Sequence, residues 1–233
     1  MNKITAIVLA RMNCNRCPGK NMSKVCGIPV IEIVLRRLSE ATKISNIVLA
    51  TSLSEDDDIL EAYVKKIGFD VFRGSEHDVI ERLLECCDIY SNDHYFLRCC
   101  ADNVFIDKDE IDKVVSVGIK GNWDYVGFKN DVYPDRISDF AGEFYKIGAL
   151  KKVSKMTNDK SDREHVFPFF EKHPEIFKTT RILTSKELHT PVKLDLDYPE
   201  DLNRLQNIAI QVPNIIQAQS SELVKIANTL QII

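Results

Sequence analysis

Short apolar segments alternate with segments of helical spacing over residues 4–127, and this alternation restricts the fold more than any other feature of the chain. Apolar segments that are typical of buried parallel strands occupy residues 4–9, 44–50, 69–73, 95–100 and 123–127. Helical segments are expected between them at 29–41, 55–67, 78–90 and 108–118. This succession predicts an α/β fold with a mostly parallel, doubly wound sheet and right-handed crossovers.

The succession ends near residue 127, where a turn-rich stretch over 130–140 follows. Further strands are predicted at 143–147, 177–183 and 191–196, and further helices at 149–155, 161–173, 199–210 and 220–233. We predict that residues 128–190 are an excursion from the sheet that covers the ligand crevice and carries a subunit contact of a homodimer. With 233 residues, of which 44% are hydrophobic, the chain suits a single domain over residues 1–233.

The charge balance and the hydropathy pattern exclude several classes of protein. A formal net charge of -4 gives no global field for nucleic acid, so that any anion site must be local. The N-terminus lacks the apolar core of a signal peptide, and no apolar run approaches the roughly 18 residues of a membrane-spanning helix. We therefore expect a cytoplasmic protein that binds neither nucleic acid nor a membrane.

Seven cysteines lie in the first 100 residues, and without an export signal they do not indicate a disulfide framework. Cys14 and Cys17 form a Cys-x-x-Cys pair beside two arginines that would acidify the thiols, so a redox motif is one alternative. A zinc site would need a second pair at ligand spacing. The adjacent doublets at 86–87 and 99–100 do not supply one and are interpreted as small apolar residues of a helix and a strand.

Three cations, Arg11, Arg16 and Lys20, lie in the loop that directly follows the first apolar segment. Open α/β sheets bind ligands beyond the carboxyl ends of their strands, so this loop should lie at the ligand crevice. Arg offers a two-pronged contact to phosphate oxygens and Lys a compact charge. The loop therefore favours a polyphosphate ligand, and a solvated basic loop is the alternative interpretation.

Two acidic residues follow predicted strands: Asp102 after 95–100 and Asp197 after 191–196. Both should project near the basic loop. Mg²⁺ prefers oxygen ligands and is usually held by one or two carboxylates together with substrate phosphates. The pair therefore predicts a magnesium site shared with a polyphosphate, whereas each residue alone could be an ordinary loop aspartate.

The basic loop reads Ala10-Arg11-x-x-Cys14-x-Arg16-x-Pro18-Gly19-Lys20, and further motifs follow in order. They are Ala50-Thr51-Ser52, Val71-Phe72-Arg73-Gly74-Ser75-Glu76-x-Asp78-Val79, Arg98-x-x-Ala101-Asp102, Tyr133-Pro134-Asp135, Arg163-Glu164-His165-Val166 and Asp197-x-Pro199-Glu200-Asp201-Leu202. Together they resemble the cytidylyltransferases that activate acidic sugars, in particular the branch of the spore coat polysaccharide synthesis protein F, which is related to CMP-Kdo and CMP-sialate synthetases. The resemblance covers roughly residues 4–210.

This resemblance implies a three-layer, Rossmann-like (GT-A-like) nucleotidyltransferase fold that uses CTP and Mg²⁺ and releases pyrophosphate. It also implies roles for individual residues. The triphosphate would be held by Arg11, Arg16 and Lys20. The metal would be held by Asp102 and Asp197, which complete the catalytic set. The nucleoside would lie near Leu9, Ala10, Arg73, Gly74 and Ser75. The acceptor would face Tyr133, Asp135, Arg136, Arg163 and His165. Structural contacts are expected for Glu164 and Glu200.

Three residues depart from the pattern of the resembled family. Cys14 replaces a serine near the phosphates, Val104 replaces a proline, and Arg136 replaces a common glycine. The triphosphate site is largely kept and the acceptor site is altered. We therefore expect an unusual anionic acceptor, either a sugar acid or a phosphorylated or phosphonate metabolite, in surface polysaccharide or related biosynthesis.

The predicted reaction is an in-line attack of an acceptor oxygen on the α-phosphorus of CTP. Such catalysis rests on positioning and charge stabilisation, so a covalent nucleophile is not needed. His165 is either a general base or a structural hydrogen-bonding residue beside Glu164. The main alternative is a non-catalytic nucleotide-binding homologue, against which the presence of both Asp102 and Asp197 argues, and a redox protein built on the Cys-x-x-Cys pair is the third.

Overall fold

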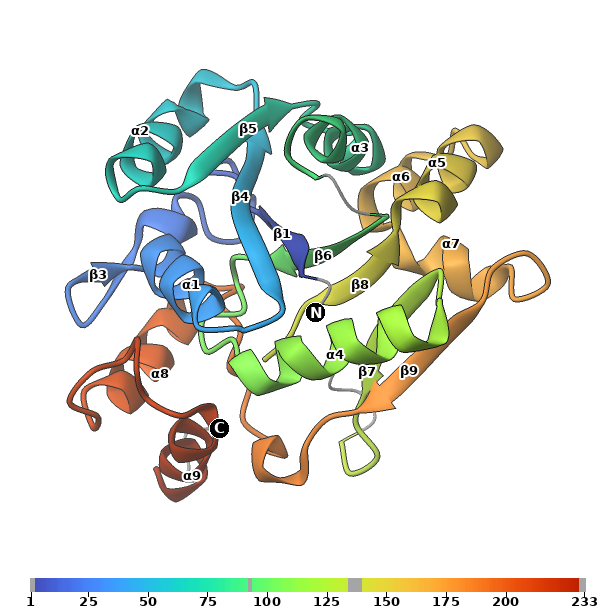
Figure 1. Cartoon of the computed structure of the whole chain (residues 1–233). Coiled ribbons are helices and arrows are strands. Elements are labelled where there is room, and N and C mark those ends of the chain that lie inside the picture. The colour runs from blue at the N-terminus through green and yellow to red at the C-terminus, as the bar shows by residue number, and fades with distance from the viewer. Residues whose placement is uncertain (1–2, 92–93, 134–139, 231–233) are drawn as a thin grey trace.

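A seven-stranded mixed sheet forms the centre of this computed structural model, which describes residues 3–91, 94–133 and 140–230 (Figure 1). Its strands lie in the order β5-β4-β1-β6-β8-β7-β9. Their bounds are β1 (Ile4–Leu9), β4 (Ile44–Ser52), β5 (Asp70–Gly74), β6 (Tyr95–Cys100), β7 (Tyr125–Lys129), β8 (Glu143–Lys146) and β9 (Thr179–Leu183). β8 runs antiparallel to β6 and β7, and the other neighbouring pairs are parallel.

Helices cover both faces of the sheet, and a short hairpin of β2 (Lys24–Val25) and β3 (Ile28–Pro29) lies beside it. The helices are α1 (Val30–Ser39), α2 (Asp58–Lys66), α3 (Val79–Tyr90), α4 (Lys108–Gly121), α5 (Ile147–Met156), α6 (Lys160–His165), α7 (Phe167–Lys172), α8 (Pro199–Ala209) and α9 (Ser220–Thr229). Three 3-10 turns are η1 (Lys20–Met22), η2 (Glu55–Asp57) and η3 (Lys186–Leu188). Among the described residues, no helix has the length and apolar character needed to cross a membrane.

The sheet is buried on both faces because its side chains alternate between two apolar clusters. On β1, Ala6 and Val8 pack with α1, α2 and α4, whereas Ile7 packs with α3, α5 and α7 on the opposite face (Figure 1). Strands enclosed in this way need apolar residues at every position, which explains the continuous apolar runs in the sequence. The prediction of a three-layer α/β fold with a mostly parallel sheet is confirmed.

Three sequence predictions differ from the structure. Residues 128–190 are only partly an excursion, because β8 and β9 return to the sheet. Residues 191–196 do not form a strand and make only one isolated bridge, between Asp195 and Asn103. The helix predicted at 161–173 is broken into α6 and α7 at Val166, where φ is +57°. In a continuous helix, the ring of Pro168 would clash with the carbonyl of Glu164, so the chain must turn there.

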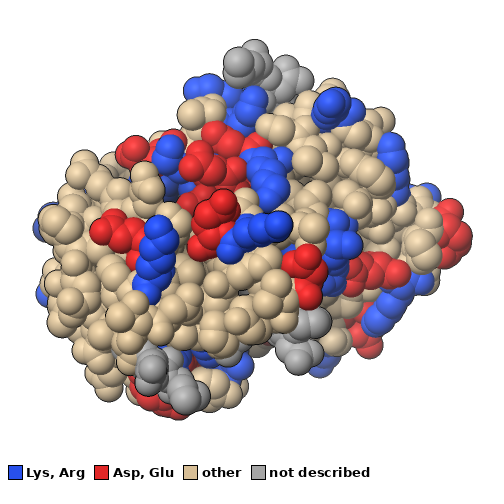
Figure 2. Space-filling model, turned by 90° about the horizontal axis from the view of Figure 1, so that it is seen from below, with Lys and Arg blue, Asp and Glu red and all other residues tan. Residues whose placement is uncertain are grey.

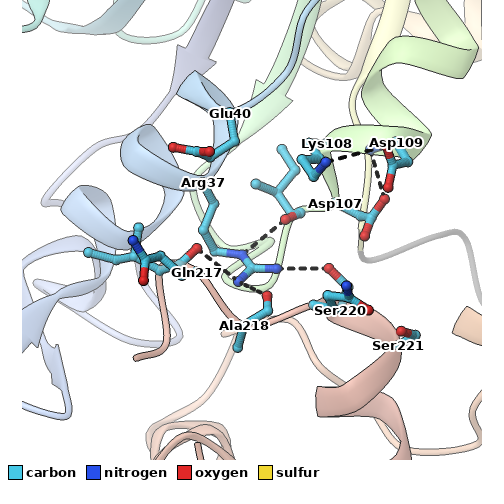
Figure 3. Close-up of a pocket in the computed structure, with 12 residues that line it drawn as sticks. Arg37, Glu40, Asp107, Lys108, Asp109, Gln217, Ala218, Ser220 and Ser221 are labelled. Atoms are coloured by element: carbon cyan, nitrogen blue, oxygen red, sulfur yellow. Dashed lines mark hydrogen bonds and ion pairs between the residues drawn. The ribbon is translucent and has the colours of Figure 1, made fainter. Parts of the chain in front are cut away.

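A third apolar cluster packs α8 and α9 below the sheet. Arg37 of α1 forms hydrogen bonds with the C-terminal segment that precedes and begins α9. The Arg37 guanidinium donates to the Ala218 carbonyl and to Ser220 Oγ, both at 2.8 Å (Figure 3). It also donates to the carbonyl oxygens of Ile106 (3.0 Å) and Ile215 (2.7 Å). Burial lowers its pKa to about 10. A hollow of about 230 Å³ lies beside it, but its guanidinium is already occupied by these backbone contacts, so we assign Arg37 a structural role.

Candidate active site

The loop after β1 is held in shape by contacts from two other parts of the chain. The Met12 N–H donates to Asp57 Oδ1 at 2.6 Å, and Asn21 Nδ2 donates to the Arg11 carbonyl at 2.7 Å. Gly19, with φ of +74°, allows the turn into η1, and its N–H donates back to the Met12 carbonyl at 2.9 Å. The cationic side chains therefore start from a fixed backbone.

Asp57 is a positioning residue that the sequence did not reveal. Its buried carboxylate accepts hydrogen bonds from Thr51 Oγ1, from the Ser52 N–H and hydroxyl, and from the Met12 N–H. Burial acts to raise the pKa of Asp57, but the hydrogen bonds from Ser52, Met12 and Thr51 outweigh it and lower the pKa. In the sequence Asp57 lies in the acidic run over residues 55–58, which indicates only the start of the helix expected at 55–67.

Lys20 lies at the centre of the charged groups of the loop. Its ammonium donates to the Leu196 carbonyl at 2.7 Å and to Asp102 Oδ2 at 3.1 Å, and lies 3.6 Å from Asp197 Oδ1. The residue is only 7% exposed. Burial acts to lower the pKa of Lys20, but Asp102 and the other nearby groups outweigh it and raise the pKa. The two predicted metal ligands therefore lie on either side of one buried cation.

Asp197 reaches this position without a strand behind it. The Leu196 N–H donates to the Asp102 carbonyl at 2.9 Å, and the Asp197 N–H donates to Asp201 Oδ2 at 2.9 Å, so the backbone is fixed on both sides. The carboxylate contacts Arg16 Nη2 at 2.7 Å and Lys193 Nζ at 3.2 Å. Burial acts to raise the pKa of Asp197, but Lys193 and the neighbouring cations outweigh it and lower the pKa.

Asp201 caps the start of α8 and makes the folded state depend on pH. Burial acts to raise the pKa of Asp201, but hydrogen bonds from the Tyr198 N–H and from Lys193 outweigh it, so that the pKa falls to about 2 from an ordinary value of 3.8. Arg204 Nη1 also donates to it at 2.6 Å. Because the pKa is lower in the folded state, the stabilisation is present above about pH 4 and is lost as the pH falls towards 2.

Replacing Asp201 with Asn is expected to lower the free energy of unfolding at pH 7 by about 2 kcal/mol. Urea unfolding of wild type and variant at pH 7, 5, 4 and 3 measures the difference, which should shrink below pH 4. Asp109→Asn is the matched control, since Asp109 lies in the first turn of α4 with its side chain 81% exposed. A difference between wild type and Asp201→Asn that is the same at pH 3 and pH 7 would contradict the assignment.

A pocket of about 220 Å³ opens beside the loop and contains much of the predicted site. Leu9 and Ala10 line it, together with the three loop cations, Asp102 and His165. On the face seen in Figure 2, acidic and basic side chains are mixed. The concentration of cations in this pocket is therefore local, as a charge of -4 requires.

Arg73 is not among the residues that line this pocket. Its guanidinium donates to the Ser52 carbonyl at 2.8 Å and forms ion pairs with Asp58 and Glu61. Gly74 and Ser75 follow it in the chain, and Ser75 Oγ accepts a hydrogen bond from the Asp78 N–H at 3.1 Å. In the segment predicted to lie near the nucleoside, the Arg73 side chain is therefore directed to α2 and not to the pocket.

Of the residues predicted to face the acceptor, only some line the pocket in the part of the chain that the structure describes. Arg163 does not line the pocket: its guanidinium pairs with Asp78 and donates to the Ser154 and Thr157 carbonyls at 3.1 and 3.0 Å, which ties α6 to the start of α3. Tyr133 is half-buried, and its N–H donates to Asn130 Oδ1 at 2.9 Å. Residues 135 and 136, Asp and Arg, lie outside the described residues, so their predicted roles stay predictions.

Among the charged residues that line the pocket, three had no predicted ligand role: Glu164, Arg82 and Arg98. Glu164 lies 3.7 Å from Arg11 Nη2, and Arg11 Nη1 also donates to the Glu76 carbonyl at 2.9 Å. Arg98 belonged to one of the motifs that carried the resemblance, whereas Arg82 appeared in the sequence only as a polar position of a helix. Neither the spacing nor the charge pattern of α3 indicated that Arg82 faces a pocket.

The cysteines do not support a redox centre. All seven thiols are free, and burial raises the pKa of Cys17, the opposite of the thiolate stabilisation that a reactive Cys-x-x-Cys pair requires. Cys86, Cys87 and Cys99 are buried in the apolar clusters, as predicted for small apolar residues. Cys14 lines the pocket at the position where the resembled family has serine.

A magnesium site would depend on two carboxylates. Within the described residues, no group of three or more His, Cys, Asp or Glu side chains is arranged to hold a metal ion. Mg²⁺ bound through phosphates needs only one or two carboxylates from the protein. Asp102 and Asp197 approach the same ammonium at 3.1 and 3.6 Å, and both offer the carboxylate oxygens that Mg²⁺ prefers, so their chemistry fits such an ion.

The fold is the Rossmann-like α/β fold of nucleotidyltransferases, and solved structures share it. A cytidylyltransferase from Leptospira borgpetersenii superposes with a TM-score of 0.88 at 24% identity, over 99% of this chain and 95% of that one. CMP:2-keto-3-deoxy-manno-octonic acid synthetase in complex with CTP superposes with a TM-score of 0.69 at 14% identity, over 90% and 99% of the two chains.

The amino-acid sequence places the protein more narrowly. Residues 5–225 match the cytidylyltransferase family, and the chain belongs to this family. An uncharacterized protein of Methanocaldococcus jannaschii is 34% identical over 176 residues, covering 76% of this chain and 70% of the relative. The spore coat polysaccharide biosynthesis protein SpsF of Bacillus subtilis is 27% identical over 234 residues, covering 98% of this chain and 95% of the relative.

Proposed function

We propose that this protein transfers CMP from CTP to a small anionic acceptor, with Mg²⁺ as cofactor and with release of pyrophosphate. The observation that carries the proposal is the buried Lys20 ammonium between Asp102 and Asp197, at the wall of a pocket that also contains Arg11 and Arg16. Fixed cations beside paired carboxylates complement a triphosphate with its metal ion. Preorganised charge of this kind is the main source of catalysis in group transfer to and from phosphates.

The loop cations would bind the triphosphate and hold the departing pyrophosphate. Arg16 is the most exposed of them, with its side chain 54% exposed, and would turn from Asp197 to a phosphate oxygen. Lys20 is fixed, because its ammonium donates one hydrogen bond to the Leu196 carbonyl and another to the Asp102 carboxylate. Asp102 and Asp197 would hold Mg²⁺, which when bound supplies neutralisation of the phosphate charge.

The acceptor would enter beside α6, where Glu164 and His165 line the pocket. His165 is in a position to accept the proton of an attacking hydroxyl, whereas a phosphate or carboxylate oxygen needs no base. Arg163 supports these residues by tying α6 to α3. We propose a sugar acid or a phosphorylated or phosphonate metabolite as acceptor, and the SpsF relative favours a place in surface polysaccharide or related biosynthesis.

The test is the release of pyrophosphate from CTP in the presence of Mg²⁺ and a panel of acidic sugars and phosphorylated or phosphonate metabolites. We expect release that requires CTP, an anionic acceptor and Mg²⁺, and that EDTA abolishes. Parallel reactions with UTP, ATP and GTP should be slower. Tight CTP binding without turnover on any acceptor would favour the non-catalytic homologue, and equal rates with CTP and UTP would leave only nucleotidyl transfer.

A further inference from the structure

Arg82, on the second turn of α3, is a buried cation that lines the active-site pocket and has an unusual set of contacts. The residue is only 2% exposed, and among the described residues no carboxylate lies within ion-pair distance of its guanidinium. Nη1 donates to the Ser75 carbonyl at 2.9 Å, while Nε is buried without a hydrogen-bond partner. Burial, with the nearby Arg11 cation, lowers the pKa of Arg82 to about 10, so it stays charged at neutral pH.

A buried N–H without a partner costs on the order of 1–3 kcal/mol, so the group calls for a partner, and a ligand in the adjoining pocket would supply one. The Ser75 carbonyl occupies Nη1 and leaves Nε without a partner, a condition that Arg98 Nε in the same pocket shares. An arginine edge matches two acceptor atoms that lie side by side in one plane. The missing partner is therefore expected to be a planar group with two adjacent acceptors.

The segment that the sequence associates with the nucleoside converges on this arginine. Ser75 holds the guanidinium, and Gly74 makes room for the side chain, since a Cβ at Gly74 would lie 3.0 Å from Arg82 Cγ and 2.8 Å from Phe72 Cε1. Arg73, the arginine predicted from the sequence, is held by Asp58 and Glu61 instead.

The surroundings of Arg82 suit a small ring. Leu9 at the end of β1 and Val79, one turn earlier on α3, line the same pocket and offer apolar surface. Arg98 also lines it, but Arg98 pairs with Glu143, which in turn accepts from the Tyr125 and Tyr145 hydroxyls at 3.0 and 2.9 Å. Arg82 is thus the buried arginine of this pocket without a carboxylate partner among the described residues.

We propose that Arg82 is the residue that distinguishes cytosine from uracil, by donating from its Nε edge to O2 and N3 of the cytosine ring. The inference rests on the proposed function, in which CTP is the donor nucleotide. In cytosine O2 and N3 are adjacent acceptors, whereas in uracil N3 carries a proton that would face the Arg82 donors. A buried donor opposite a donor leaves both unpaired, which is how polar sites reject a near-isostere.

The experiment measures the dissociation constants of CTP, UTP and 3-deaza-CTP, in which a C–H replaces N3, for wild type and Arg82→Gln by calorimetry. Wild type is expected to prefer CTP over UTP by roughly 100-fold and over 3-deaza-CTP by at least roughly tenfold. In Arg82→Gln the three constants should lie within about threefold of one another, since the Gln amide can present either a donor or an acceptor. Inorganic pyrophosphate should bind both proteins equally, which shows that the triphosphate loop is intact.

Two further arginines provide controls. Arg37→Gln removes an equally buried guanidinium at the other hollow, and it should leave the CTP to UTP ratio unchanged even if the protein becomes less stable. Arg73→Gln tests the arginine predicted from the sequence, and loss of the preference there with retention in Arg82→Gln would overturn the proposal.

The remaining outcomes separate this inference from the proposed function. Equal binding of CTP and 3-deaza-CTP by wild type would overturn the inference even if the Arg82 variant failed to fold. An Arg82→Gln protein that keeps the CTP preference but shows a raised acceptor KM would also overturn it and assign Arg82 to the acceptor. A wild type that binds pyrophosphate but does not distinguish CTP from UTP would contradict the choice of CTP as donor.

Discussion

Asp102→Asn and Asp197→Asn are each expected to lower turnover by at least roughly 100-fold while the protein stays folded, because an anionic ligand of the proposed Mg²⁺ and triphosphate site is lost. The fold should survive, since Lys20 keeps the Leu196 carbonyl and the remaining carboxylate as partners. The measurement is the rate of pyrophosphate release at saturating CTP and Mg²⁺, with the melting temperature followed in parallel.

Asp88→Asn is the matched control, since Asp88 forms an ion pair with Lys151 on α5 with its side chain 63% exposed and does not line the pocket. Its turnover should equal that of wild type, because exposed ion pairs contribute about 0–1 kcal/mol. Near wild-type turnover in either Asp102→Asn or Asp197→Asn would contradict the assignment of that residue to the metal.

Lys20→Ala is expected to lower kcat by roughly 100-fold or more and to raise the KM for CTP as well. The ammonium would contact phosphate oxygens on which negative charge grows as pyrophosphate departs, so its contribution is larger in the transition state than in the ground state. Steady-state kinetics with varied CTP separates the two parameters. An unchanged kcat with a raised KM would mean that Lys20 binds ground state and transition state equally.

Arg16→Ala provides the comparison within the same loop. Arg16 is half-exposed and pairs with Asp197, whereas Lys20 is 7% exposed and held by the Leu196 carbonyl. A preorganised cation loses less freedom on contacting the phosphates, so the effect of Lys20→Ala on kcat should exceed that of Arg16→Ala. The opposite order would show that the exposed Arg16 carries the charge stabilisation.

The sheet and the cationic loop could be predicted because their signals are local. A strand buried on both faces must be apolar throughout, and a loop after the first such strand must open at the crevice, so Arg11, Arg16 and Lys20 were placed together correctly. Asp197 was also placed correctly in space, although the strand predicted before it does not form. Its position depends on the cap made by Asp201 and on the backbone contact with Asp102. Neither contact produces a repeating pattern in the sequence from which it could be predicted.

The direction of a long side chain could not be predicted in the same way. Arg73 and Arg163 belong to the expected motifs, but each has carboxylates from another element within reach and turns towards them. For Arg82 the opposite holds. A charged residue at this position of α3 suggests a surface site, yet the Arg82 side chain lies buried at the pocket. Which carboxylate an arginine meets depends on tertiary packing, and the local sequence does not encode it.

The position of β8 between β6 and β7 has a consequence for how the polypeptide assembles. β8 follows β7 in the chain, yet it lies between β7 and β6, so β7 can join the sheet only after residue 146 has been made. Until then the inner edge of β6 is an open row of backbone donors and acceptors, which is a template for pairing with other chains. Glu143, the partner of Arg98 beneath the pocket, arrives with that same strand. A nascent or truncated chain that ends before β8 is therefore expected to be prone to aggregation, although it already contains the whole cationic loop.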